Sequence, residues 1–277
     1  MNAPERLPLP DIQSNSDTRE LAIGRVGVKG LRQPLRVHSV DGTVTMTIAS
    51  VDMYVGLPAD QKGTHMSRFI EVLERHGREL SASAFASLFE RMLERLDAPA
   101  GYIEMRFPYF LEKTAPVSGV KSLMDYDVTL RREKVQAGAP VEYWLQVLVP
   151  VTSLCPCSKE ISAYGAHNQR SHVTIKVLVV EPVQGGALSI SQLVAVAERA
   201  ASCELYGLLK RTDEKFVTER AYDNPKFVED LVRDIALELQ QDARIGAFSV
   251  ESENFESIHN HSAYARIDIE KRAPRLQ

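Results

Sequence analysis

The chain has 277 residues, of which 44% are hydrophobic and 25% charged, and its net charge is −4. These values are typical of a globular protein with a sizeable core, and the slightly acidic balance argues against a nucleic-acid partner. No apolar run reaches the roughly 18 residues of a membrane span, so we expect no membrane partner. We expect no secretion either, because the first residues lack a signal pattern. Three cysteines, two of them separated by one proline, favour reduced thiols and a cytoplasmic location.

The first half of the chain predicts strands around a pair of helices. Residues 1 to about 19 hold three prolines and show no periodicity, so we expect a flexible N-terminal tail. The β-branched, roughly alternating pattern of residues 44–55 predicts a strand. Apolar faces predict helices over residues 65–80 and 83–96. Further strands are predicted over residues 102–110, 120–131, 141–151 and 172–180.

The second half repeats this order. A long helix is predicted over residues 189–210 with Ser189 as its N-cap. Asn224 and Pro225 predict the start of another helix, because Asn is a cap residue and Pro fits the first helical position. Strands over 248–257 and 263–269 close the chain. The repeat predicts an α+β fold of two antiparallel modules, about 20–140 and 141–277, which share one sheet within a single domain of residues 20–277.

The stretch 152–171 gathers two cysteines and one histidine within twenty residues. Thiolate and imidazole groups close together are ligands of zinc-type or iron-type cations. Pro156 fixes its φ, so both flanking sulfurs could reach one cavity, but two bonds to one ion from so short a segment would be cramped. We therefore expect one cysteine to be a ligand and the other to have a separate role. The alternative is two small buried cysteines beside a surface histidine, His167.

Two further groups of residues extend this candidate site. Glu204 falls in the apolar stripe of the predicted long helix, so its carboxylate is expected to face the core, where it requires a metal or a cationic partner. The alternative places it at the edge of the helix, and Cys203 beside it is expected to be a plain core residue. His259 and His261 lie in a stretch rich in glutamate, whose alternative is a solvated hairpin. Together, these thiol, imidazole and carboxylate groups suit a divalent metal that activates water.

The same residues resemble the GTP cyclohydrolase IB family over residues 20 to about 270. The motifs are Thr152-Ser-Leu-Cys-Pro-Cys-Ser-Lys-Glu-Ile-Ser, Gly165-Ala-His-Asn-Gln-Arg-Ser, Ser202-Cys-Glu-Leu-Tyr and Glu256-Ser-Ile-His-Asn-His-Ser-Ala-Tyr. Two further stretches share the resemblance, namely Gln61-Lys-Gly-Thr-His-Met-Ser-Arg-Phe and Asn224-Pro-Lys-Phe-Val-Glu-Asp.

The resemblance implies a tunnelling fold of two tandem modules and a homotetramer with active sites at subunit interfaces. It implies conversion of GTP and water to 7,8-dihydroneopterin triphosphate and formate, the entry to tetrahydrofolate synthesis. It also implies one divalent metal per active site, which is zinc, manganese or iron(II), and no organic cofactor. Bound metal would lower the pKa of its water toward neutrality, so that hydroxide attacks C8 of guanine.

The resemblance also implies roles for individual residues. Cys155 resembles the metal thiolate, and the other metal candidates are His167, Glu204 and His259. Cys157 resembles a second functional cysteine, and Cys157 or His167 is expected to move the protons that reach N7 and N9.

Substrate recognition is implied for a further set of residues. Glu219 resembles the acid that anchors guanine, with Glu256 as the other candidate acid, while the alternative for Glu219 is a glutamate on an exposed helix. A triphosphate requires cations, which we expect among Arg68, Lys159, Arg170 and Lys215.

Two rival functions remain open from the sequence. A nitrile reductase of the same fold would use a nucleophilic cysteine and NADPH, and it would need no metal. A structural zinc protein would close its site with four protein ligands.

Overall fold

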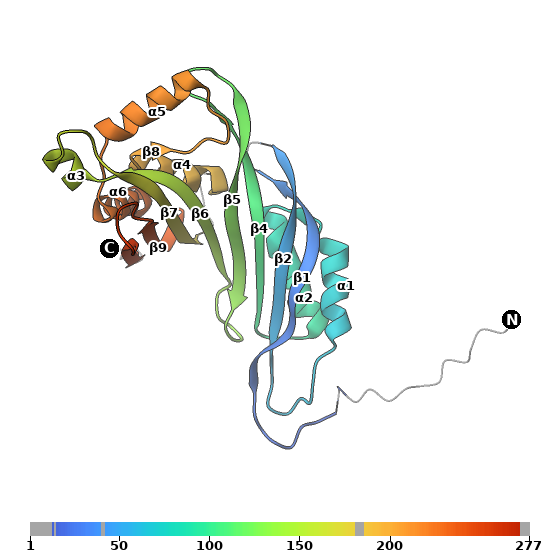
Figure 1. Cartoon of the computed structure of the whole chain (residues 1–277). Helices are drawn as coiled ribbons and strands as arrows, with labels where there is room; N and C mark the ends of the chain where they lie inside the picture. Colours follow the sequence, from blue (N-terminus) through green and yellow to red (C-terminus); the bar gives the residue numbers. More distant parts are fainter. Residues whose placement is uncertain (1–12, 14, 40–41, 181–185, 272–277) are drawn as a thin grey trace, which may run out of the picture.

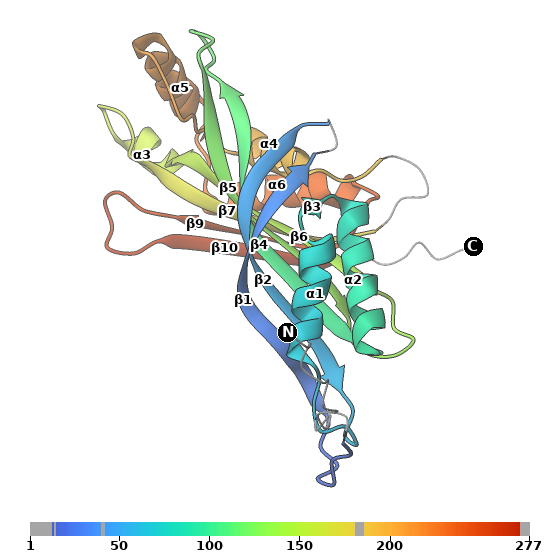
Figure 2. The ribbon, with the colours of Figure 1, turned by 90° about the vertical axis from the view of Figure 1, so that its right-hand side faces the viewer.

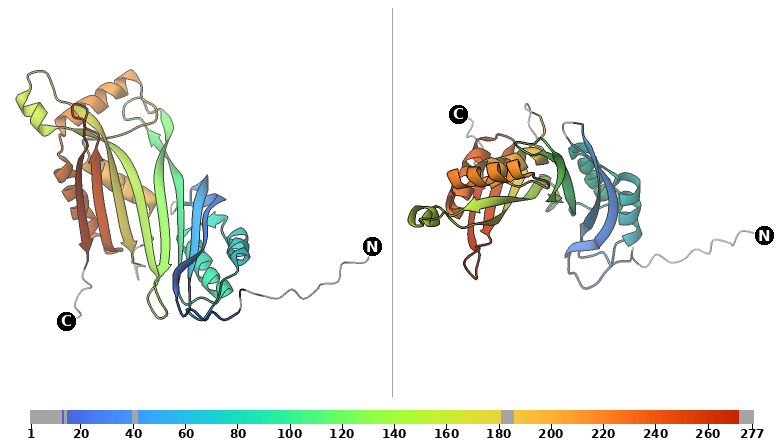
Figure 3. Two further views of the ribbon diagram at one scale, coloured as in Figure 1. Left: turned by 60° about the horizontal axis from the view of Figure 1, so that its bottom comes forward. Right: turned by 45° about the horizontal axis from the view of Figure 1, so that its top comes forward.

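The computed structural model describes residues 13, 15–39, 42–180 and 186–271. In this part of the chain a single ten-stranded sheet runs through the whole molecule, and Figure 3 shows its strands side by side. The strand order is β10-β9-β7-β6-β5-β4-β2-β1-β3, with β8 paired to β6. The strands are β1 (Ile23–His38), β2 (Val44–Leu57), β3 (Glu79–Leu80), β4 (Gly101–Thr114), β5 (Lys121–Lys134), β6 (Glu142–Leu154), β7 (Asn168–Val179), β8 (Cys203–Glu204), β9 (Ile245–Asn254) and β10 (Ala263–Glu270).

Helices cover one face of this sheet. They are α1 (Met66–His76), α2 (Ala82–Leu96), α3 (Pro156–Ile161), α4 (Ile190–Ala200), α5 (Arg211–Asp223) and α6 (Val228–Gln241). The pair α1 and α2 packs on the β1–β2–β4 half, and the pair α4 and α6 packs on the other half (Figures 1 and 2). The short α3 and the polar α5 lie at one end of the molecule (Figure 1). None of the described helices is long and apolar enough to cross a membrane.

Alternation along the strands builds the core. In β6, Val147, Val149 and Val151 are fully buried, whereas the residues between them are half-buried on the face without helices. The same alternation continues through β4, β5 and β7, so one continuous apolar core joins both halves. Burying each such side chain contributes roughly 1.5–3 kcal/mol. The core therefore fixes which face of β6 meets the helices. It also fixes the position of the C-terminal end of β6.

Most predicted elements are confirmed, as is the sheet shared between the two halves. The predicted helix over 65–80 ends at His76, and its last residues instead form β3, which pairs with β1. Residues 1–12 and 14 of the predicted tail lie outside the described residues. Residues 15–17 contact residues 60–62 through backbone hydrogen bonds and an isolated bridge. The division into a tail, one domain and two modules stays a prediction.

The predicted helix over 189–210 is wrong beyond Ala200. Ser189 is its N-cap as predicted, with a capping box to Gln192. After Ala201 the chain turns to pair with β6, because the backbone N–H of Ser202 donates to the carbonyl of Thr152 at 3.1 Å. The Ser202 hydroxyl also accepts the Leu154 N–H at 3.1 Å. These bonds replace helical ones, so Glu204 lies on a short strand and not in a helical stripe.

Asn224 and Pro225 end a helix where the sequence predicts that one begins. Asn224 is the C-cap of α5, and α6 begins three residues after Pro225, behind Phe227. The Asn224 side-chain amide donates to the carbonyl of Ala201 at 2.8 Å, so it ties α5 to the end of α4. Pro225 then prevents α5 from continuing.

Candidate functional site

Cys155 sits where β6 ends and α3 begins. It is the N-cap residue of α3, its sulfur accepts the Ser158 backbone N–H at 3.4 Å, and Pro156 fills the first helical position. The turn places the two sulfurs differently, because Cys155 is half-buried and Cys157 is exposed. Separate roles for the two cysteines stay a prediction, and the difference in exposure is compatible with it.

Backbone hydrogen bonds hold Cys155 beside His167. The Cys155 N–H donates to the His167 carbonyl at 3.1 Å. The Ser158 hydroxyl joins both residues, because it donates to the Cys155 carbonyl at 3.2 Å and accepts the His167 N–H at 3.2 Å. Gly165 permits the turn between them with a φ of 122°, which side-chain-bearing residues rarely adopt. We call residues 155–167 the Cys155 loop.

The His167 ring is oriented by two polar side chains. Its Nδ1 lies 3.0 Å from Oε1 of Gln169 and 3.7 Å from Oε2 of Glu256. Because an amide oxygen can only accept, Nδ1 is the donor in this contact, and in the neutral imidazole Nε2 is then the nitrogen with the free lone pair. The His167 and Glu256 side chains are each only 13% exposed. The ring is therefore set up to use Nε2 as a ligand or a base.

Glu204 lies on β8, where it pairs with Val151 of β6. Its carboxylate accepts the Tyr206 hydroxyl at 2.6 Å and lies 2.9 Å from Nη1 of Arg220 on α5. Burial alone would raise the pKa of Glu204, but the Tyr206 hydrogen bond, its own backbone N–H and the Arg220 charge bring that pKa below its ordinary value. The cationic partner that the sequence requires for this acid is Arg220.

A second charged pair lies close to Glu204. Lys113 at the end of β4 contacts the Glu198 carboxylate of α4 at 2.7 Å, and both side chains are mostly buried. The Lys113 ammonium also lies 5.3 Å from the centre of the Tyr206 ring, and its charge helps to lower the pKa of Glu204. The Tyr126 hydroxyl donates to Glu198 at 3.1 Å. These contacts join α4, β4 and β5 to β8.

Cys203, next to Glu204, belongs to the core as the sequence predicts. Its side chain is almost fully buried. Burial, followed by the neighbouring Glu204 charge, raises the pKa of the Cys203 thiol to about 11. Cys203 is therefore neutral at physiological pH.

The two late histidines lie on the hairpin between β9 and β10. His259 and His261 are exposed, and their rings stack with centroids 5.1 Å apart. Glu256, at the start of the same hairpin loop, reaches His167. The loop of this hairpin thus starts beside the Cys155 loop. His259 lies three residues after Glu256 in the same hairpin loop.

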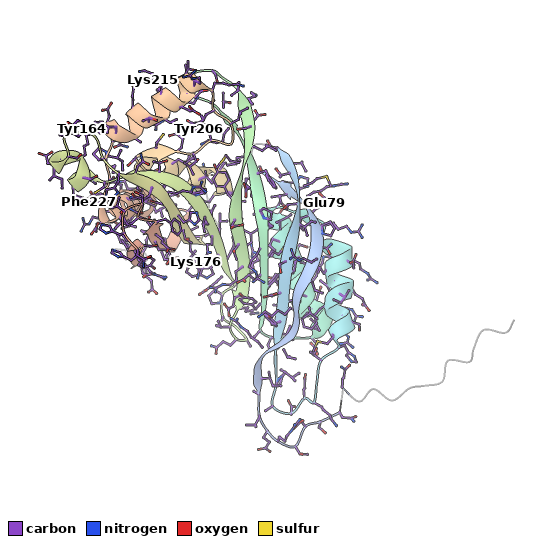
Figure 4. All side chains as sticks on the ribbon, in the orientation of Figure 1. Glu79, Tyr164, Lys176, Tyr206, Lys215 and Phe227 are labelled. Atoms are coloured by element: carbon purple, nitrogen blue, oxygen red, sulfur yellow. The ribbon has the colours of Figure 1, made fainter. Side chains whose placement is uncertain are left out.

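Glu219 and Lys215 lie on the outer face of α5. They form an exposed ion pair one turn apart, with the Lys215 Nζ at 2.6 Å from Oε1 of Glu219. Figure 4 shows Lys215 and Tyr206 on opposite sides of α5. Glu219 therefore occupies an exposed position on this helix, the alternative considered from the sequence.

The three other candidate cations come from three different elements, and Arg68 lies far from the other two. Lys159 of α3 lies 4.3 Å from the centre of the Tyr222 ring, which ties α3 to α5. Arg170 lines a recess of about 400 Å³ together with His172 and Tyr206. Arg68 lies on α1, at the opposite end of the molecule from α3 (Figure 1).

The donor chemistry of Cys155 and His167 suits a zinc-type cation. Across residues 13, 15–39, 42–180 and 186–271, however, no three Cys, His, Asp or Glu side chains gather closely enough to hold a metal ion. Within one chain, the described side chains therefore offer at most part of a ligand set, and the roles of Cys155, His167, Glu204 and His259 as ligands stay predictions.

Several residues of the site were not singled out from the sequence. Ser158 and Gln169 stand inside the motifs that carry Cys155 and His167, and Tyr206 stands two residues after Glu204. The positions of Gln169 and Tyr206 were a usable signal, because each stands two residues after a candidate and alternate residues on extended backbone share a face. Arg220 gave no such signal, because it reaches Glu204 only through the folded path of α5.

Solved structures with a similar fold are uricases. The chain matches uricase from Arthrobacter globiformis with a TM-score of 0.50 and 9% identity, over 91% of this chain and 95% of the uricase. It matches a urate oxidase variant from Bacillus sp. TB-90 with a TM-score of 0.51 and 8% identity, over 90% and 99% of the two chains. At this identity the likeness concerns the fold alone, and it confirms the predicted tunnelling fold.

Similarity in sequence extends over nearly the whole chain. A protein from Herminiimonas arsenicoxydans described as GTP cyclohydrolase FolE2 is 60% identical, over 95% of this chain and 98% of its own length. One of the same description from Azoarcus sp. (strain BH72) is 56% identical, over 98% and 99%. The matching family model covers residues 9–265 and is described as Type I GTP cyclohydrolase folE2.

The family name that the motifs suggest, GTP cyclohydrolase IB, is corrected by this match, because the model and the relatives carry the FolE2 description. The correction concerns the family name and leaves the reaction type, a type I GTP cyclohydrolase, unchanged. From the matched range and the identity of the relatives, the chain belongs to the type I GTP cyclohydrolase FolE2 family.

Proposed function

We propose that the Cys155 loop is the catalytic centre at which this enzyme acts on GTP. The enzyme is a GTP cyclohydrolase that converts GTP to 7,8-dihydroneopterin triphosphate in folate biosynthesis, and formate carries away C8 of the guanine. One observation carries the proposal, namely that Cys155 and His167 are joined in a single hydrogen-bonded loop. The family assignment decides against the nitrile reductase and the structural zinc protein.

Metal dependence belongs to this family. We assign one divalent cation to each active site, as zinc, manganese or iron(II), and no organic cofactor. Its proposed ligands are Cys155 and His167, with Glu204 and His259 as further candidates. The orientation of the His167 ring supports this choice, because Gln169 occupies Nδ1 and leaves the Nε2 lone pair for the cation. Glu204 would have to exchange Arg220 for the metal.

Glu219 is the proposed guanine anchor. One carboxylate accepts two hydrogen bonds from the N1–H and the amino group of guanine, which adenine cannot provide together. Glu256 is the other candidate, but Gln169 and His167 already engage it. Among the described residues, Glu219 forms an ion pair with the exposed Lys215, and exposed pairs of this kind contribute little. Glu219 is therefore freer to turn toward a substrate.

The separation of the candidate residues supports an active site shared between subunits. Glu219 is exposed on α5. Arg68 lies on α1, at the opposite end of the molecule from Cys155. We propose a homotetramer in which residues of neighbouring subunits complete each site. The triphosphate would then meet cations from more than one subunit, with Arg68, Lys159, Arg170 and Lys215 as candidates.

Proton transfer falls to residues of the Cys155 loop. Ring opening requires protons at N7 and N9, and the groups proposed for this are Cys157 and His167. Cys157 is exposed on α3, so it is accessible to a substrate bound over the loop. The proposed location is the cytoplasm, because all three cysteines are free thiols.

Incubation of the purified enzyme with GTP tests the proposed function. Formate release and pterin fluorescence after oxidation are measured with and without a chelator, followed by addition of each metal. We expect both products to appear together, to vanish with the chelator and to return with zinc, manganese or iron(II). Undiminished turnover in the chelated, metal-free protein would contradict the assigned metal site.

A further inference from the structure

Helix α5 is held in place by very little apolar packing. Of its residues only Asp213 and Ala221 are buried, whereas α6 buries six residues against the sheet. Figure 1 shows α5 at the end of the molecule, outside the layer formed by α4 and α6. Because apolar burial normally fixes where a helix lies, α5 must depend on other contacts for its position.

Asp213 supplies the main contact at the start of α5. Its side chain is fully buried although it is an acid. Its Oδ1 accepts the backbone N–H groups of Val117 and Ser118, each at 2.8 Å. Its Oδ2 accepts the Ser118 hydroxyl at 2.6 Å and the Lys210 N–H at 2.8 Å. One carboxylate thus joins the turn between β4 and β5 to the first turn of α5.

The four hydrogen bonds compensate for the burial of this charge. Burial by itself raises the pKa of Asp213, but the bonds from Ser118, Lys210 and Val117 hold that pKa well below its ordinary value. Asp213 is therefore ionised in the folded enzyme. Four donors also satisfy the capacity of a carboxylate, so the contact is complete without water.

A second contact joins the loop before α5 to the hairpin formed by β4 and β5. A Cβ at Gly207 would lie 2.7 Å from the carbonyl oxygen of Leu123 and 3.1 Å from the Ser122 hydroxyl. Only a glycine allows this approach between the loop and β5. The segment that leads from Glu204 to α5 is therefore fixed on the hairpin at two places.

The far end of α5 reaches the candidate site. Arg220 contacts Glu204, and the Asn224 amide binds the carbonyl of Ala201. Between these ends the helix presents Glu219 outward. The position of Glu219 is thus set by contacts at both ends of α5, and Asp213 is the buried charge at one of them.

We propose that Asp213 is a positioning residue for substrate binding, which fixes α5 on the β4–β5 hairpin and thereby places Glu219 for guanine. This inference rests on the proposed role of Glu219. Asp213 does not touch substrate in the proposal, so its effect should fall on GTP binding and not on metal content.

The variant Asp213→Asn tests the proposal. The amide keeps the size of the carboxylate but cannot accept at all four positions, because its NH₂ group faces a backbone N–H. We expect KM for GTP to rise about tenfold, with kcat changed less than about twofold. Metal content should not change, and hydrogen exchange should increase in residues 211–223 but not in α6.

Asp230→Asn is the matched control. Asp230 occupies the corresponding third position of α6, where it accepts the Phe227 N–H at 3.4 Å, but it joins no hairpin. KM and the hydrogen exchange of residues 211–223 should match the wild type in this variant. Ser118→Ala is a milder second variant, which removes one donor and should raise KM about threefold in the same direction. If Asp213→Asn fails to fold, KM and hydrogen exchange in Ser118→Ala test the positioning role instead.

Comparison with Glu219→Gln separates this inference from the proposed function. Unchanged KM and unchanged exchange of residues 211–223 in Asp213→Asn and Ser118→Ala would overturn the positioning role, whatever Glu219→Gln shows. If Glu219→Gln leaves KM unchanged while Asp213→Asn raises it, the guanine assignment fails, and Asp213 positions another residue of α5. A rise in KM in both variants supports both proposals.

Discussion

The backbone N–H of Cys155 donates to the carbonyl oxygen of His167 at 3.1 Å. This bond closes the Cys155 loop, and Ser158 reinforces it from inside. The residues that carry the thiol and the imidazole are thereby joined through their backbones by the protein alone. Such preorganisation lowers the cost of binding a cation or a substrate, because the groups need not be ordered at that moment.

Ser158→Ala should weaken metal binding without removing any proposed ligand. The hydroxyl bonds both the Cys155 carbonyl and the His167 N–H, so its loss leaves the direct bond between Cys155 and His167 without this reinforcement. We expect a loss of about 1–2 kcal/mol in stability and a higher metal dissociation constant in a competition titration with a chromophoric chelator. Ser162→Ala is the control, because Ser162 bonds only the neighbouring Tyr164 N–H through its hydroxyl. Equal metal affinity in wild type and Ser158→Ala would show that the hydroxyl bonds of Ser158 do not contribute to metal binding.

The three cysteines should differ in their reactivity toward iodoacetamide. Cys157 is exposed, whereas Cys203 is almost fully buried with its pKa raised to about 11 by burial and by Glu204. Thiolate is the reactive form, so in native protein near pH 7 Cys157 should react first and Cys203 last. Peptide mass spectrometry over time measures this order, and all three should react in urea. Native alkylation of Cys203 as fast as Cys157 would contradict its place in the core.

Acid should remove the stabilisation that Asp213 provides. The pKa of Asp213 is lowered in the folded state, so below its ordinary value of 3.8 the unfolded chain binds a proton that the folded chain does not. The stability difference between wild type and Asp213→Asn is therefore full above about pH 5 and shrinks as the pH falls below about 4. Urea unfolding across this range measures it. A difference that stays constant down to about pH 3 would show that the folded pKa is not lowered.

Two variants that are each impaired at low GTP should restore activity together if the active site is shared between subunits. Cys155→Ala removes a proposed metal ligand, and Glu219→Gln removes the proposed guanine anchor. Co-expressed in one cell, they form mixed assemblies in which some interfaces contain both intact residues. At a GTP concentration well below the KM of Glu219→Gln, we expect the purified mixture to release formate faster than either variant alone. A mixture that is no faster than its components, despite proven mixed assembly, would place both residues of a site in one subunit.

The sequence predicted the long strands other than β1, because alternating residues such as Val147 and Val149 report directly on a half-buried sheet. It missed α5, whose buried positions are an aspartate and an alanine, so no apolar stripe marks it. It also made no prediction for β1, whose exposed start gives only a weak alternation. The prediction of one long helix was wrong from Ala201 onward, because the chain there pairs with β6 and this pairing overrides helical periodicity.

For the candidate site, local motifs were informative and long-range contacts were not. Cys155 and His167 lie in one stretch of sequence, and the fold holds them together. The need of Glu204 for a cationic or metal partner was foreseen, but not that Arg220 would supply it. That contact depends on how α5 folds back over β8, which residue spacing does not encode.

Elemental analysis of anaerobically purified protein, made alongside a formate-release assay, tests the central claim most directly. Cys155→Ala is compared with wild type and with Cys203→Ala, which alters a cysteine of the core. The account predicts about one metal per active site in wild type and Cys203→Ala, and loss of both metal and formate release in Cys155→Ala. Full metal occupancy in Cys155→Ala would contradict the account, because it would remove Cys155 from the ligands.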